Sequence, residues 1–95
     1  MMKDFVNKLV EEKKLENVSP EVLEQVKLDL EERLDERINV MILDRMPSYK
    51  IEEFEKILDS KSEEEIQQFC QENIPGLEEL VASELLDFRK TYLGL

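Results

Sequence analysis

Apolar residues recur at helical spacing along almost the whole chain, and they divide it into five predicted helices. In each of these helices the large aliphatic and aromatic side chains lie three or four residues apart, which is the period of an amphipathic helix. No run alternates with the period of two that a strand requires. The pattern therefore predicts an all-α fold, a compact irregular bundle of about five helices around a long central second helix. The predicted helices cover residues 3–14, 20–46, 49–59, 63–72 and 77–93.

Capping signals mark the starts of three of these helices. Ser19 precedes Pro20, which is a strong start signal because serine is a favoured N-cap and proline suits the first helical position. Ser48 is predicted to cap the third helix in the same way. Ser62 and Glu65 have the spacing of a capping box, which predicts that the fourth helix begins directly after Ser62.

The second half of the long helix, residues 38–43, is apolar almost all the way round. Such a helix is predicted to be covered on most sides, by the shorter helices or by a partner chain. A strict heptad repeat would place arginines in the seam, which disfavours a long coiled coil. The core positions that we predict for this helix are Val22, Leu23, Val26, Leu30, Leu34, Ile38 and Met41.

Two arginines of the long helix, Arg33 and Arg37, fall within the angular range of its apolar positions rather than on its polar face. One interpretation is that their stems cover apolar surface while their guanidinium groups reach water or pair with Asp29 and Glu36. The other is an ion-pair network with acids of the C-terminal half of the chain or of a second subunit. Both interpretations remain open at this point.

Composition and charge predict one acidic domain that covers residues 1–95. The chain is 41% hydrophobic and 39% charged, with a net charge of −11, and this length suffices for one core but not for two. Residues 51–88 contain 12 acidic and two basic residues, a net charge of −10, which disfavours binding to nucleic acid. No segment approaches 18 consecutive apolar residues, so we expect no membrane span.

The sequence offers little to support catalysis or metal binding. It has no histidine, which excludes histidine-dependent zinc and di-iron sites and histidine-activated nucleophiles. Its two isolated glycines cannot form a phosphate-binding loop. The single cysteine, Cys70, is interpreted mainly as a small buried hydrophobe and secondarily as a reactive thiol. We therefore expect no enzyme, no cofactor and no metal, and a cytoplasmic location, because one cysteine forms no internal disulfide and the chain shows no secretory signal.

Clustered acids fall in the predicted first turns of the helices, as Glu52-Glu53 and Glu63-Glu64 show. Carboxylates at these positions are favoured by the helix dipole, which is the simplest account of them. An acidic binding surface is the second interpretation, and metal binding or catalysis is the least favoured of the three.

Four stretches of the sequence consist of helix caps and core positions: Ser19-Pro20, LEERLDER at 30–37, MPSYKIEEFEKILDS at 46–60 and IPGLE at 74–78. They resemble a family of small acidic helical proteins that is known as a domain of unknown function and occurs mostly in reduced-genome bacteria of the candidate phyla. The resemblance covers residues from about 15 to 92. It implies an all-helical bacterial domain without assigned activity, and it transfers no active-site residue.

Taken together, these patterns predict a non-enzymatic protein-interaction module. We expect it to bind its unknown protein partner, for which a basic protein is one candidate, through the acidic surface of residues 51–88 or an apolar groove beside residues 38–46. One alternative is a homo-oligomeric structural or assembly protein, such as a homodimer paired through the long helix. Another is an acidic mimic of nucleic acid. The candidate interaction residues are Arg33, Arg37, Met41, Met46, Glu52, Glu53, Glu63 and Glu64.

Overall fold

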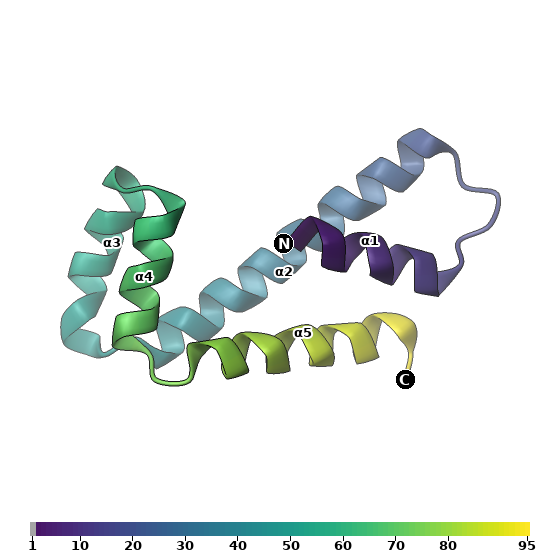
Figure 1. Cartoon of the computed structure of the whole chain (residues 1–95). Coiled ribbons are helices and arrows are strands. Elements are labelled where there is room, and N and C mark those ends of the chain that lie inside the picture. The colour runs from purple at the N-terminus through teal and green to yellow at the C-terminus, as the bar shows by residue number, and fades with distance from the viewer. Residues whose placement is uncertain (1) are drawn as a thin grey trace. The chain divides into compact units, whose positions relative to one another are not determined.

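The computed structural model describes residues 2–95, and its regular structure is entirely helical (Figure 1). No strand occurs among these residues, so the predicted all-α class with five helices is confirmed. A short 3-10 helix, η1, lies between the second and third helices. The elements are α1 (Met2–Lys13), α2 (Pro20–Arg45), η1 (Ser48–Lys50), α3 (Ile51–Ser60), α4 (Glu63–Asn73) and α5 (Leu77–Leu93).

Two of the predicted caps are confirmed and one is wrong. The Ser19 hydroxyl accepts a hydrogen bond from the Val22 amide at 3.2 Å, and the Ser62 hydroxyl accepts one from the Glu65 amide at 3.3 Å. Ser48 does not cap α3, because the chain first turns through η1 directly after Pro47. Ser48 therefore lies inside this turn, and α3 begins after it without a side-chain cap.

The chain divides into two compact units. The first unit contains the described residues up to Arg37 together with Glu84–Leu95, and the second contains Ile38–Ser83. Both divisions fall inside helices, so α2 and α5 each contribute residues to both units.

The buried side chains of the first unit come from α1 and from the middle of α2. Val22, which was predicted to belong to this core, is exposed instead. It lies about 80° around the helix from Leu30 and about 120° from Leu34, so it falls off the buried stripe. The buried side chains of this unit are Val6, Leu9, Val10, Leu30 and Leu34.

The connection between α1 and α2 contains two non-glycine residues with left-handed backbone geometry. Lys14 has a φ of 54° and Asn17 has a φ of 58°. Asparagine tolerates this region comparatively well, whereas lysine carries the usual steric penalty of a side chain with positive φ.

The core of the second unit includes a helical hairpin formed by α3 and α4 (Figure 1). The rings of Phe54 on α3 and Phe69 on α4 are stacked, with centroids 6.0 Å apart and an interplanar angle of 10°. The end of α2 and the start of α5 belong to the same compact unit as the hairpin. The buried side chains of this unit are Ile38, Met41, Met46, Phe54, Cys70, Ile74 and Leu77.

Candidate interaction surface

Arg37 is part of an ion-pair network with α5, whereas Arg33 is not. The Arg37 guanidinium binds the Glu84 carboxylate and lies 3.9 Å from Asp87, both within the first unit. Arg33 pairs with Asp29, one turn away on α2, at 3.1 Å. The network interpretation therefore holds for Arg37 and the local interpretation for Arg33. Since Glu84 and Asp87 belong to the first unit, they do not extend the acidic surface of the second.

Met41 and Met46 lie in the core of the second unit, where both side chains are buried. Met41 continues the stripe of α2 that also buries Ile38, whereas Met46 is buried directly after the last residue of α2. Neither methionine is thus available to line an open groove beside residues 38–46.

Three apolar side chains of this region are exposed, two on the side of α2 that faces away from Met41 and one in η1. Val40 and Leu43 are 67% and 45% exposed, and Tyr49 in η1 is 80% exposed. Val40 and Leu43 are three residues apart and share one helix face. We call Val40, Leu43 and Tyr49 the apolar face. Residues 38–43 were predicted to be covered on most sides by the shorter helices or by a partner chain, and the shorter helices leave Val40 and Leu43 exposed.

A helical projection of the sequence alone contained the signal for this face. Val40 and Leu43 lie about 100° to 160° around the helix from Met41, which continues the buried stripe. A single stripe of contacts cannot cover both sides of a helix, so two of these apolar residues had to remain exposed or meet another chain.

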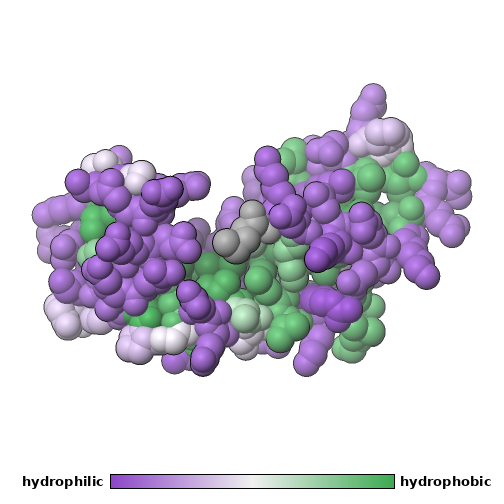
Figure 2. Space-filling model, viewed as in Figure 1, coloured by the Kyte–Doolittle hydropathy of each residue, from purple (hydrophilic) through white to green (hydrophobic). Residues whose placement is uncertain are grey.

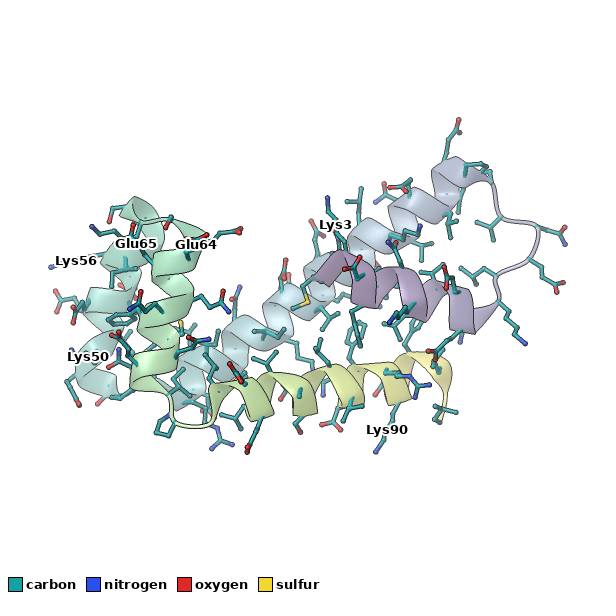
Figure 3. All side chains as sticks on the ribbon, viewed as in Figure 1. Lys3, Lys50, Lys56, Glu64, Glu65 and Lys90 are labelled. Atoms are coloured by element: carbon teal, nitrogen blue, oxygen red, sulfur yellow. The ribbon has the colours of Figure 1, made fainter. Side chains whose placement is uncertain are left out.

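The acids of α3 and α4 form the most strongly charged part of the second unit. Residues 51–73, which we call the acidic hairpin, contain eight acidic and two basic residues, and Glu52, Glu53, Glu63 and Glu64 are all exposed there. Figure 2 shows hydrophilic side chains over most of this hairpin, and Figure 3 shows Glu64 and Glu65 at the start of α4. The two ion pairs of the hairpin region are local, Lys50–Glu53 at 3.3 Å and Lys61–Glu65 at 3.8 Å.

Charge is distributed unevenly between the two units. The second unit has 11 acidic and four basic residues, a net charge of −7. The first unit has 13 acidic and nine basic residues, a net charge of −4. The second unit thus combines the apolar face with the larger excess of negative charge.

Cys70 is buried on α4 in the core of the second unit. Burial raises the pKa of its thiol, because the apolar surroundings disfavour the thiolate. A thiol that stays protonated at neutral pH is a poor nucleophile. The structure therefore supports the interpretation of Cys70 as a small core residue.

Two hollows, one in each unit, are open to solvent and lack a hydroxyl or thiol nucleophile. One hollow of about 420 Å³ in the first unit has Lys14 and Lys27 beside apolar residues, and one of about 350 Å³ in the second unit has Glu78 and Glu79 beside Leu77. No serine, threonine or cysteine lines either hollow. Within residues 2–95, no three acidic or cysteine side chains are grouped so that they could hold a metal ion, and no helix is long and apolar enough to cross a membrane.

Comparisons with known proteins identify the family but supply no function. No curated protein and no solved structure matches the chain. The family described as protein of unknown function DUF5663 matches residues 9–92, which extend from α1 to the last turn of α5. This match confirms the resemblance to a domain of unknown function, and the chain belongs to the DUF5663 family.

Proposed function

We propose that this chain is a non-enzymatic protein-interaction module that binds a basic, amphipathic segment of a partner through the second unit. The observation that carries this proposal is the exposure of Val40, Leu43 and Tyr49 in the unit that has a net charge of −7. An apolar centre with charged residues around it is the usual composition of a protein–protein interface.

The apolar face supplies affinity, and the acidic hairpin supplies selectivity. Burying a valine, leucine or aromatic side chain that was exposed stabilises a complex by roughly 1.5 to 3 kcal/mol before the costs of association. Uncompensated acids mainly accelerate association with a cationic partner and reject acidic ones. A partner helix with lysine or arginine beside leucine-like side chains would satisfy both.

A second copy of the same chain is the alternative occupant of the apolar face. Each copy carries a net charge of −11, so a symmetric contact between second units would bring like charges together. This repulsion favours a basic partner over a homodimer. Mimicry of nucleic acid would use the acidic hairpin alone and would leave Val40 and Leu43 without a role.

The remaining parts of the proposal rest on the sequence and on Cys70. The absence of histidine from the sequence supports a non-enzymatic role. One buried, unpaired cysteine suits a reducing compartment, and we propose the cytoplasm of a bacterium.

The test is a titration with synthetic helical peptides that lack tyrosine. The Tyr92→Phe background leaves Tyr49 as the only intrinsic fluorophore, because the chain has two tyrosines and no tryptophan. A peptide with lysine on one face and leucine on the other should quench or enhance this signal saturably. The double variant Val40→Ser/Leu43→Ser should weaken binding about tenfold or more.

A matched control is available on the same helix. Leu28 is 52% exposed but belongs to the first unit, so Leu28→Ser should leave binding unchanged. An equal loss in Leu28→Ser would contradict the proposed surface. Equally tight binding of a peptide with lysine but no leucine would favour mimicry of nucleic acid. If sedimentation shows a dimer with a micromolar dissociation constant, and Val40→Ser/Leu43→Ser abolishes this dimer, the homo-oligomer would be favoured.

A further inference from the structure

The second half of α5 contributes no buried side chain to the first unit. Between Glu84 and Leu93, the apolar side chains Leu85, Phe88 and Tyr92 are only half-buried, and Leu86 is exposed. All five buried residues of this unit come from α1 and α2. The segment therefore lies against the unit without anchoring its core.

Charged groups make the specific contacts of this segment at both of its ends. Near its start, Arg37 of α2 binds Glu84 and approaches Asp87. Near its end, Arg89 pairs with Glu12 of α1 at 2.7 Å. These pairs join residues 47 to 77 positions apart in the sequence.

Lys13 adds a further contact at the end of α5. Its ammonium group donates a hydrogen bond to the Tyr92 carbonyl oxygen at 3.0 Å and lies 5.2 Å from the centroid of the Tyr92 ring. The carbonyl groups of the last turn of a helix lack hydrogen-bond partners within the helix, and Lys13 supplies a donor to one of them. Its positive charge also interacts favourably with the negative, C-terminal end of the helix dipole.

We propose that residues 84–93 form an electrostatically held latch, which opens by local unfolding from the C-terminal end of α5 while the core between α1 and α2 stays intact. Partly exposed ion pairs are individually weak and are screened by salt, whereas buried apolar contacts are not. Segments held by few buried contacts open at a lower free energy than the whole domain. Opening uncovers Leu85, Phe88 and Tyr92, so ionic strength controls the exposure of a second apolar region, separate from the apolar face.

Amide hydrogen exchange of the full chain, resolved by residue, tests the latch. Raising the salt concentration from about 20 mM to about 500 mM shortens the Debye length several-fold and should accelerate exchange at residues 88–93 about fivefold or more. Exchange in α3 and α4 should not accelerate, because added salt screens the repulsion among the acids of the acidic hairpin and so stabilises these helices. These helices also show in every sample that the chain remains folded.

Substitutions separate the latch from a general effect of salt. Arg37→Gln/Arg89→Gln should give fast exchange at residues 88–93 already at low salt and remove most of the salt response. Arg33→Gln removes an arginine of the same helix that pairs only with Asp29, and it should leave this exchange unchanged. The proposal is overturned if residues 88–93 exchange as slowly as Leu30 and Leu34, or if Arg33→Gln has the same effect as the double variant.

Discussion

The two units use charge in opposite ways. In the first unit, Arg37–Glu84 and Arg89–Glu12 connect different helices, and Arg33–Asp29 is a local pair. In the second unit, the ion pairs among the described residues join neighbours three or four positions apart, and α3 and α4 associate through the Phe54–Phe69 stack and the buried side chains around it. Charge therefore contributes to tertiary structure in the first unit and remains mostly uncompensated surface in the second.

This difference supports the proposal that one acidic chain combines an internal contact region with an external one. The first unit has a smaller excess of acids, 13 against nine bases, and some of these acids pair with arginines of another helix. The second unit folds by apolar packing, which leaves its acids free for another molecule. A substitution should accordingly have a different effect in each unit, even when the chemical change is the same.

Removing a core side chain should have the largest effect in either unit. Phe54→Ala in the second unit and Leu34→Ala in the first should each lower the free energy of unfolding by about 2 to 5 kcal/mol. Because α2 and α5 continue from one unit into the other, we expect both variants to shift one common transition. Urea unfolding followed by Tyr49 fluorescence in the Tyr92→Phe background measures this.

The informative variant is Leu34→Ala, because its substitution and its reporter lie in different units. If the urea midpoint reported by Tyr49 fluorescence is unchanged in Leu34→Ala, the second unit unfolds independently. The prediction of a single cooperative domain would then be wrong. Phe54→Ala is the positive control, since it lies in the same unit as Tyr49.

Placing a hydroxyl in each core should show that both are dry. Cys70→Ser in the second unit and Val10→Thr in the first nearly preserve volume but bury a polar group, and each should cost about 1 to 3 kcal/mol. Val22→Thr, the same change at an exposed position, should cost under about 0.5 kcal/mol. Thermal unfolding by circular dichroism measures all three, and equal melting points for Val10→Thr and Val22→Thr would contradict a dry core in the first unit.

Breaking the ion pair between α2 and α5 should cost less than opening a core. Arg37 and Glu84 have side chains that are 37% and 26% exposed, so water partly compensates a stranded carboxylate. Arg37→Met should lower stability by about 1 to 2 kcal/mol, and Arg33→Met by less than about 0.5 kcal/mol. Urea unfolding at low salt measures the free energy of unfolding of both variants. An equal decrease in Arg37→Met and Arg33→Met would contradict the distinction between the network of Arg37 and the local pair of Arg33.

Breaking a local pair in the second unit should have the smallest effect. Lys61 and Glu65 are both well exposed and four residues apart, so Lys61→Met should cost about 0.3 kcal/mol or less. Lys56→Met is a suitable control, because Lys56 is in none of the ion pairs among residues 2–95. A loss in Lys61→Met as large as that in Arg37→Met would show that charge supports both units equally.

The elements were predictable from the sequence because their signals are local. Ser19 and Ser62 cap the helices that directly follow them, and an amphipathic period is visible within a few turns. Ser48 misled the prediction, because serine is also common in turns and the short 3-10 helix after Pro47 left no distinct pattern.

The site was less predictable because it depends on contacts between distant residues. The sequence showed that Arg37 needed acceptors, but it could not choose between Glu36 nearby and Glu84, which is 47 residues away. It also showed that residues 38–43 were apolar almost all the way round, without indicating which side the other helices would cover. Burial of Met41 and exposure of Val40 were decided by the packing of the second unit.

The left-handed backbone at Lys14 has a consequence for engineering. Glycine adopts this geometry without steric cost, whereas lysine retains it at a penalty of roughly 1 kcal/mol, partly offset by the greater freedom of glycine in the unfolded chain. The natural sequence thus leaves unused stability in the link between α1 and α2, which belongs to the first unit, whereas the apolar face and the acidic hairpin belong to the second. Lys14 is consequently a position where a more robust version of the domain could be obtained without changing either of these surfaces.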